Sequence, residues 1–384
     1  MPAHLCILTS VHKPFDGRIF HREARTLAEA GYRITLLAPS DEAPQTRNGI
    51  RILPVARPFT RLGRPLVWWR LLRQTLKLKP DVIHFHDPEL LLLVPLFHLL
   101  LKKSPRIIYD VHEYFVDSLA DKYWIPAKLR PIVVRLAGIL EKYLAAKVDA
   151  IVCAVQEQTM LYGYFNGPIV VLRNLPRLTL FSNPVPVPSL DMPGFKLIYV
   201  GLILPKRGVS TLLQAMNILR KDGYKNIKLF LLGPPTSQTY IDEIHNYIQE
   251  HRLEEQVYWL GYIPHTELKH YLANADVGMA PGRFTRQYRR PAIATKLFEY
   301  MLGGVPIITS DQPHRRKYIE ESHCGLAVPA DDVQAHADAI LWLYRHPEDA
   351  RAMGQRGRDM VLDHYTWEIE APKLLALYQN LLTS

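Results

Sequence analysis

The chain has 384 residues, of which 48% are hydrophobic and 22% charged, and its formal net charge at pH 7 is +10. This length and composition exclude a disordered protein and a small disulfide-stapled one, and they predict a globular protein of two domains. The three cysteines are far apart and odd in number, so they form neither a disulfide framework nor the spacing of metal ligands: Cys6, Cys153 and Cys324. This pattern indicates a reducing, cytoplasmic location.

Short apolar runs alternate with segments of helical periodicity throughout the first half of the chain. We expect strands at Leu5–Thr9, Arg33–Ala38, Ile50–Pro54, Val82–Phe85, Ile107–Val111, Ala150–Ala154 and Ile169–Leu172. We expect helices at Ile19–Ala30, Leu66–Leu78, Leu90–Leu101 and Pro131–Ala145. Because Leu90–Leu101 contains Pro95 and is shorter than the ~20 residues of a membrane span, it is interpreted as a buried helix. The alternation predicts a parallel sheet covered on both faces.

The excess of positive charge lies in the first half, where Ala43 to Pro80 contains no acidic residue. Within it, Pro65–Lys79 has a predicted apolar face of Leu66, Trp69, Leu72 and Leu76. A basic amphipathic helix with tryptophans suits an anionic membrane surface. The residues that would make this contact are Trp68, Trp69, Arg70, Arg73 and Lys77. The alternative is a core-packed helix with a solvated basic face.

A stretch with three prolines, 183–189, predicts a linker, and a second βα series follows it. We expect strands at Lys196–Val200, Ile227–Leu232, Val257–Leu260, Val277–Ala280, Pro306–Thr309 and Leu326–Val328. We expect helices at Val209–Lys221, Tyr240–His251, Thr266–Ala273, Ala294–Leu302, Val333–Tyr344, Pro347–Leu362 and Trp367–Leu382. The chain is therefore predicted to form two doubly wound α/β domains, residues 1–182 with the returning helix 367–384, and residues 190–366. Ligands of such sheets bind at the carboxyl ends of the strands, here in a cleft between the domains.

The helix that begins near Ala294 carries Lys296 and Glu299 three positions apart, so both side chains should project from one face. The backbone amides of the first helical turn and the charge of Lys296 could bind an anion. The carboxylate of Glu299, one turn further on, could accept hydrogen bonds from two neighbouring hydroxyls, as on a ribose. The loop from Gly201 to Gly208 adds Lys206 and Arg207. These features outline a nucleotide-diphosphate site. An amphipathic helix with a solvated Lys–Glu pair is the alternative.

The ordered set of motifs resembles the retaining glycosyltransferases of family 4, which have the GT-B fold of two Rossmann-like domains. In the second half these are GLILPKRG, LLGPP, LGYIP, ADVGMAP and KLFEYMLGGVPII; in the first half they are DGR, VIHFHDP, YDVHE and VLRN. The resemblance implies Arg207 and Lys296 at the donor diphosphate, Glu299 at the ribose and His112 near the transferred sugar. Gly201, Lys206, Gly233 and Leu297 are also assigned to the donor site, since Gly201 lets the loop turn, Lys206 can meet the diphosphate and a base could rest at the turn with Gly233.

Other residues of the first half are assigned to the acceptor side or to support of the site. These are Asp16, Gly17, Arg18, His86, Glu113 and Asn174. Two positions depart from the family pattern: Leu202 stands where an arginine is usual, and Pro291 where the first glutamate of an E-x7-E pair is usual. Lys206, Arg289 or Arg290 would compensate for the arginine.

The resemblance implies transfer of a sugar from a nucleotide-diphosphate donor, a UDP-sugar more than GDP-mannose, to a glycan or lipid-linked acceptor in surface polysaccharide synthesis. Basic side chains would stabilise the departing diphosphate, so no metal and no other cofactor is expected. The enzyme would work in the cytoplasm at the inner face of the membrane. A nucleotide-sugar epimerase on the same scaffold and a non-catalytic nucleotide- or glycan-binding protein remain as alternatives. No nucleic-acid partner is expected, because no recognition motif accompanies the basic residues.

Overall fold

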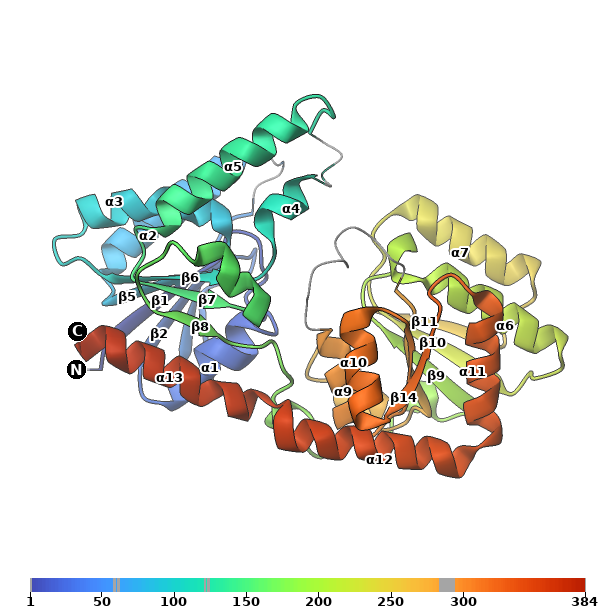
Figure 1. Cartoon of the computed structure of the whole chain (residues 1–384). Coiled ribbons are helices and arrows are strands. Elements are labelled where there is room, and N and C mark those ends of the chain that lie inside the picture. The colour runs from blue at the N-terminus through green and yellow to red at the C-terminus, as the bar shows by residue number, and fades with distance from the viewer. Residues whose placement is uncertain are drawn as a thin grey trace. The chain divides into compact units, whose positions relative to one another are not determined.

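The computed structural model describes residues 2–57, 60, 63–120, 122, 125–282 and 294–383. The chain divides into two compact units, residues 1–174 with 367–384, and residues 175–366. The boundary precedes the proline-rich stretch, which belongs to the second unit: the Val185 amide donates to His270 Nδ1 at 2.8 Å. Each unit is an α/β fold built on a sheet of parallel strands (Figure 1).

The first unit has the strand order β3-β4-β2-β1-β5-β6-β7-β8, in which β3 alone of the described strands runs antiparallel to its neighbour. Its strands are β1 (His4–Leu8), β2 (Arg33–Pro39), β3 (Gln45–Arg47), β4 (Ile50–Val55), β5 (Val82–Phe85), β6 (Arg106–Val111), β7 (Ala150–Cys153) and β8 (Ile169–Val171). Its helices are the π-helix η1 (Ile19–Ala24) with α1 (Arg25–Glu29), then α2 (Arg64–Leu78), the 3-10 helix η3 (Pro88–Leu93), α3 (Val94–Leu100), α4 (Phe115–Ala120), α5 (Arg130–Ala145), the 3-10 helix η4 (Gln156–Tyr162) and α13 (Trp367–Thr383).

Alternate residues of each strand point to opposite faces of this sheet, which gives two cores. Cys6 and Leu8 face the core that α2, η3, α3 and α5 cover, whereas Leu5 and Ile7 face the core that η1, α1 and α13 cover. The C-terminal helix is thus part of the first unit's core (Figure 1). Trp367 anchors it, since its Nε1 donates to Thr26 Oγ1 at 2.8 Å.

The prediction of one buried helix over Leu90–Leu101 is wrong. The segment forms η3 and then α3, because Pro95 occupies the first turn of a new helix, where its missing amide hydrogen is tolerated. One face alone is buried, and Leu99 is 77% exposed. The short helix α4 was also not predicted.

The second unit has the order β11-β10-β9-β12-β13-β14, with all pairs parallel. Its strands are β9 (Phe195–Val200), β10 (Ile227–Leu232), β11 (Val257–Gly261), β12 (Val277–Ala280), β13 (Ile307–Ser310) and β14 (Gly325–Val328). Its helices are the 3-10 turns η5 (Leu178–Leu180), η6 (Pro188–Leu190) and η7 (Pro205–Arg207), then α6 (Val209–Lys221), α7 (Gln238–Glu250), α8 (Leu268–Leu272), α9 (Thr295–Leu302), α10 (Pro313–Ser322), α11 (Val333–Arg345) and α12 (Pro347–His364).

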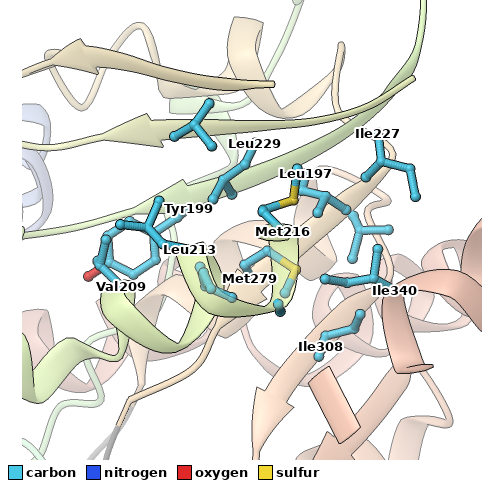
Figure 2. Packing of buried hydrophobic residues seen from close by; sticks show 14 of the residues in the cluster. Leu197, Tyr199, Val209, Leu213, Met216, Ile227, Leu229, Met279, Ile308 and Ile340 are labelled. Carbon is cyan, nitrogen blue, oxygen red and sulfur yellow. The ribbon is translucent and has the colours of Figure 1, made fainter. Parts of the chain in front are cut away.

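Two cores again sandwich the sheet. Figure 2 shows one of them, in which Met216 of α6 and Ile340 of α11 pack with strand residues such as Leu197 and Met279. The opposite core contains α9, whose residues Leu297 to Leu302 are all buried. Tight packing on both faces fixes α9 against the sheet and so fixes the polar side chains that it carries at the sheet's edge.

Candidate active site

The second sheet reverses its strand order between β9 and β12, since β10 continues on one side of β9 and β13 on the far side of β12. In open parallel sheets, ligands bind at the carboxyl ends of the strands at such a switch point. Three basic side chains come together at these ends: Lys296 from α9, Arg207 from η7 and Arg315 from α10.

Lys296 lies in the first turn of α9 and reaches the end of β9. Its Nζ donates to the carbonyl oxygen of Val200 at 2.5 Å and lies 4.9 Å from the centre of the Tyr199 ring. Desolvation and the positive charges of the two arginines lower the pKa of Lys296 well below its usual 10.5, against the opposing effect of Glu299. A bound polyanion would therefore favour the charged ammonium.

Glycines let the βα loops approach this lysine closely. Gly201 has φ +140°, and a Cβ there would lie 2.6 Å from Lys296 Nζ. At Gly233 a Cβ would lie 1.8 Å from the carbonyl oxygen of Gly201. Lys206 is exposed on η7, and Arg207 beside it is half-buried. The loop after β9 thus presents backbone and two cations at the same edge of the sheet.

Arg315 is a residue of this edge that the sequence analysis missed. It is 4% exposed, and its Nη1 donates to the carbonyl oxygen of Ala280 at 2.8 Å and to Ser310 Oγ at 3.2 Å. These partners end β12 and β13. The sequence contained an indication of this helix. A proline shortly after a strand, here Pro313, is typical of a first helical turn, and Arg315 lies in that turn at the carboxyl edge of the sheet.

Glu299 is 7% exposed, and its Oε1 lies 2.7 Å from His265 Nε2, which donates to the carboxylate. The edge of the His265 ring packs against Phe181, with ring centres 6.2 Å apart. His265 was not predicted as a site residue, although it directly follows the strand-end motif LGYIP. The side chain of Leu297 is fully buried in the core, so its contribution to an edge site is confined to its backbone.

Lys296 and Glu299 therefore contact different parts of the sheet edge, the end of β9 and the loop after β11. Arg289 and Arg290, which were expected to compensate for the missing arginine, and Pro291, which replaces the usual glutamate, lie outside the described residues.

The first sheet also reverses its order, between β1 and β5, and polar side chains meet at the carboxyl ends there. Asp87 Oδ2 accepts hydrogen bonds from Thr9 Oγ1 at 2.7 Å and from the Ser10 amide at 2.6 Å. His86 Nδ1 lies 2.9 Å from His112 Nε2, so one ring donates to the other. Two histidines that the sequence assigns to the site are thus in direct contact.

Arg18 lies at the centre of a buried charge cluster behind these histidines. Its guanidinium donates to both oxygens of Asp110 at 3.0 Å and to the carbonyl oxygen of Leu172 at 2.7 Å, and its Nε is 2.9 Å from Glu23 Oε1. Burial opposes ionisation of Asp110, but the positive charge of Arg18 and the interactions with His112 lower the pKa of Asp110 well below 3.8. Burial and the Asp110 charge raise the pKa of Glu23 well above 4.5.

Among the described residues, one group has the donor set of a metal site: Glu23, His84, His86 and Asp110, with ligand atoms within 4.8 Å of one another. The Arg18 guanidinium already pairs with both carboxylates. A divalent cation would face this buried positive charge at close range, so the donor set fits an arginine-centred ion-pair cluster better than a metal.

The remaining predicted residues of the first unit surround this cluster. Asp16 Oδ1 accepts hydrogen bonds from the two backbone amides that begin η1, at 2.8 and 3.0 Å. A Cβ at Gly17 would lie 3.2 Å from the Arg22 guanidinium. Glu113 is exposed and Asn174 is half-buried.

Helix α2 buries Val67, Leu71 and Thr75, a different face from the one predicted. Trp69 is 52% exposed, with the Arg73 guanidinium 5.4 Å from the centre of its ring. The predicted membrane residues Trp68 and Arg70 have intramolecular partners, Glu89 Oε1 and the carbonyl oxygen of Ala56. Lys77 is exposed.

Across the described part of the chain, no helix has both the length and the apolar character needed to cross a bilayer.

Comparisons with known proteins cover nearly the whole chain. The family model described as "Glycosyl transferases group 1" matches residues 187–360, and that described as "Glycosyltransferase Family 4" matches residues 17–174. Glycogen synthase of Mycobacterium tuberculosis is 23% identical over 394 residues, covering 94% of this chain and 90% of the relative.

Solved structures share the architecture at lower identity. Sucrose-phosphate synthase from Thermosynechococcus elongatus superposes with a TM-score of 0.77 at 20% identity, covering 99% of both chains. The Anabaena protein HepE, solved with UDP and glucose, superposes with a TM-score of 0.73 at 14% identity, covering 98% of this chain and 100% of that one. With the two sheets and the two family matches, the chain belongs to the family 4, group 1 glycosyltransferases of the GT-B fold and is a glycosyltransferase enzyme.

Proposed function

We propose that this enzyme transfers a sugar from a nucleotide diphosphate to a glycan or lipid-linked acceptor, with retention of anomeric configuration, in surface polysaccharide or glycoconjugate synthesis. The second unit would bind the donor, and the first unit would bind the acceptor. The convergence of Arg207, Lys296 and Arg315 on the switch point of the second sheet is the observation that carries the proposal.

Breaking the bond between sugar and diphosphate builds negative charge on the diphosphate and positive character on the sugar. Preorganised cations at the leaving group stabilise that charge in the transition state more than in the ground state. Arg207 and Lys296 would contact the diphosphate, with Lys206 at its exposed side. Arg315 supplies a charge that offsets the missing arginine at Leu202. Three cations meet the electrostatic demand of this step, so the proposed mechanism requires no metal.

Glu299 would accept hydrogen bonds from the ribose hydroxyls. His265 supports this role, because its hydrogen bond of 2.7 Å orients the carboxylate. The absence of side chains at Gly201 and Gly233 lets Lys296 and the loop after β9 pack closely at this edge, where the diphosphate and the base would bind. The donor preferred is a UDP-sugar rather than GDP-mannose, in keeping with the UDP and glucose bound by the Anabaena protein of the same fold.

His112 would contact the transferred sugar or orient the acceptor hydroxyl. His86 would hold the ring of His112 through their 2.9 Å contact. Asp16, Gly17, Glu113 and Asn174 would complete the acceptor side. Arg18 would act indirectly, because its guanidinium is bonded to Asp110 of β6, the strand that His112 follows.

A thermal-shift series with UDP- and GDP-sugars tests the donor class. Lys296→Ala and Glu299→Ala should abolish transfer while the unfolding temperature in the absence of donor stays near that of the wild type. Lys317→Ala and Glu321→Ala, which remove an exposed pair 3.8 Å apart on α10, are the matched controls and should transfer normally. Full activity in the two site variants would refute the site assignment.

The enzyme would act in the cytoplasm, at the inner face of the membrane. Contact with anionic lipid through the basic helix α2 remains part of the proposal. The exposed Trp69 and the exposed Arg73 and Lys77 support it, whereas the intramolecular bonds of Trp68 and Arg70 do not.

A further inference from the structure

Helix α5 of the first unit has an apolar outer face. Ile132, Leu136, Ile139 and Tyr143 are each between 57 and 60% exposed, and they recur at the spacing of one helical stripe. The stripe is widened along one side by Leu129 and Leu140, which are 51 and 46% exposed. At 1.5 Å per residue this helix is roughly 24 Å long, so the stripe is a sizeable surface rather than an isolated exposed leucine.

The inner face of α5 is held by one half-buried carboxylate and by apolar packing. Glu141, its acidic residue, points inward, where Oε1 accepts hydrogen bonds from Tyr109 at 3.1 Å and Tyr162 at 2.9 Å. Leu144 and Ala145 at the end of the helix enter the core beside the sheet. The inner face is thus fixed by buried contacts, and the apolar stripe cannot rotate inward without breaking them.

Positive charges flank the stripe. By helical position Lys128, Arg135 and Lys142 lie along the side opposite Leu140, and all three are exposed. Lys147 Nζ lies 4.6 Å from the centre of the Tyr143 ring at the end of the stripe. The outward surface of α5 therefore combines aliphatic side chains, one aromatic ring and basic residues, with its carboxylate turned inward.

Neighbouring helices of the same layer also expose apolar side chains. α2, α3 and α5 all pack on the core that covers one face of the first sheet. Leu96, Leu99 and Leu100 of the α3 segment are 37, 77 and 51% exposed, and Trp69 on α2 is also exposed. Figure 1 shows α2, α3 and α5 on the same side of that sheet.

We propose that the outer face of α5 docks on an anionic lipid bilayer, with the stripe at the headgroup–acyl boundary and the basic flank on the headgroups. A second copy of this chain fits less well, because a two-fold contact would bring the same basic flanks against each other. This inference rests on the proposed membrane contact and deepens it by assigning the principal contact to α5 instead of α2.

Vesicle sedimentation tests the proposal, using the full chain and phosphatidylcholine vesicles with and without phosphatidylglycerol. The variant Ile132→Gln/Leu136→Gln/Ile139→Gln should weaken partitioning onto the anionic vesicles by roughly fivefold per side chain, about a hundredfold in all. Lys128→Gln/Arg135→Gln/Lys142→Gln should lose roughly fivefold per charge, and added salt should reduce its remaining dependence on phosphatidylglycerol.

Two controls separate docking from misfolding and from the function proposed above. Val185→Gln/Leu362→Gln replaces exposed apolar residues of the second unit and should partition like the wild type. Unfolding temperature and the thermal shift given by UDP are measured on every variant and should be unchanged by the α5 substitutions.

Three results would overturn the proposal. Loss of vesicle binding in Trp69→Gln/Arg73→Gln with normal binding by the α5 apolar variant would assign the contact to α2. A wild-type chain that responds to UDP but ignores anionic vesicles would refute membrane docking and leave donor binding standing. A wild-type dimer in analytical ultracentrifugation that the α5 variant dissociates, without vesicle binding, would show that the stripe is a contact between copies.

Discussion

Replacing Gly201 with alanine should displace Lys296 and weaken donor binding. The added Cβ would lie 2.6 Å from Nζ, so Nζ must move by at least 0.8 Å to reach 3.4 Å, where ordinary contact begins. At an effective dielectric constant of ~20, lengthening an ion pair from roughly 3.0 to roughly 3.8 Å loses roughly 1.2 kcal/mol, or about sevenfold in affinity. Transfer should fall further, on the order of 100-fold, because the leaving group is then misaligned.

Gly223→Ala is the matched control for this substitution. Gly223 also has a positive φ, +91°, but a Cβ there would meet nothing within 4 Å. Both variants should lose about 1–3 kcal/mol of unfolding free energy through backbone strain, measured by urea denaturation. In calorimetry with UDP, Gly201→Ala alone should bind more weakly. Equal UDP affinity in the two variants would refute the placement of Lys296 at the diphosphate.

Three further predictions concern buried groups. Arg18→Leu should lower the unfolding free energy by about 3–5 kcal/mol in urea denaturation, because it leaves Asp110 buried without its cation. The double variant Arg18→Leu/Asp110→Asn should recover part of the lost unfolding free energy. If it recovers none, the ion-pair account is contradicted. A bound diphosphate should raise the lowered pKa of Lys296, so UDP binding takes up a proton at pH values above that lowered pKa. UDP affinity should therefore fall as the pH rises from the lowered pKa toward 10.5. Calorimetry in buffers of different ionisation enthalpy should detect proton uptake that is absent in Lys296→Met. Tyr378→Phe removes the hydroxyl that lies 2.8 Å from His84 Nδ1, and it should lower the unfolding free energy by about 1 kcal/mol. UDP affinity should stay unchanged. A weaker UDP affinity would argue against a purely structural role of the Tyr378 hydroxyl.

The sequence predicted the fold well because each local pattern agreed with the global one. The β-branched apolar run that ends at Thr309 became β13, a strand buried on both faces, as a parallel sheet requires. Helix α9 begins at Thr295, one residue from its predicted start. Leu90–Leu101 failed because one proline divided the segment and because apolar composition alone does not show which face is buried.

The candidate site was less predictable, since its contacts join distant parts of the chain. Pro313 and the motif LGYIP mark the loops near Arg315 and His265, but neither motif shows the partners of these side chains, Ala280 and Glu299, which are more than 30 residues away. The outward face of α5 depends on two tyrosines from other elements, which hold Glu141 inward. Residue spacing predicts which side chains share a helix face, but not which neighbour that face will meet.

The position of the C-terminal helix in the first unit's core affects how the protein folds during its synthesis. Leu374, Leu377 and Tyr378 complete a core whose strands were synthesised some 200 to 370 residues earlier. On the ribosome the second unit therefore has all its residues before the first unit can close. Until the last turns emerge, η1 and α1 cover only part of this face of the sheet, and the part that α13 covers stays exposed. Nascent chains stalled before Trp367 should bind chaperones that recognise apolar strands and should release them once the final helix is added.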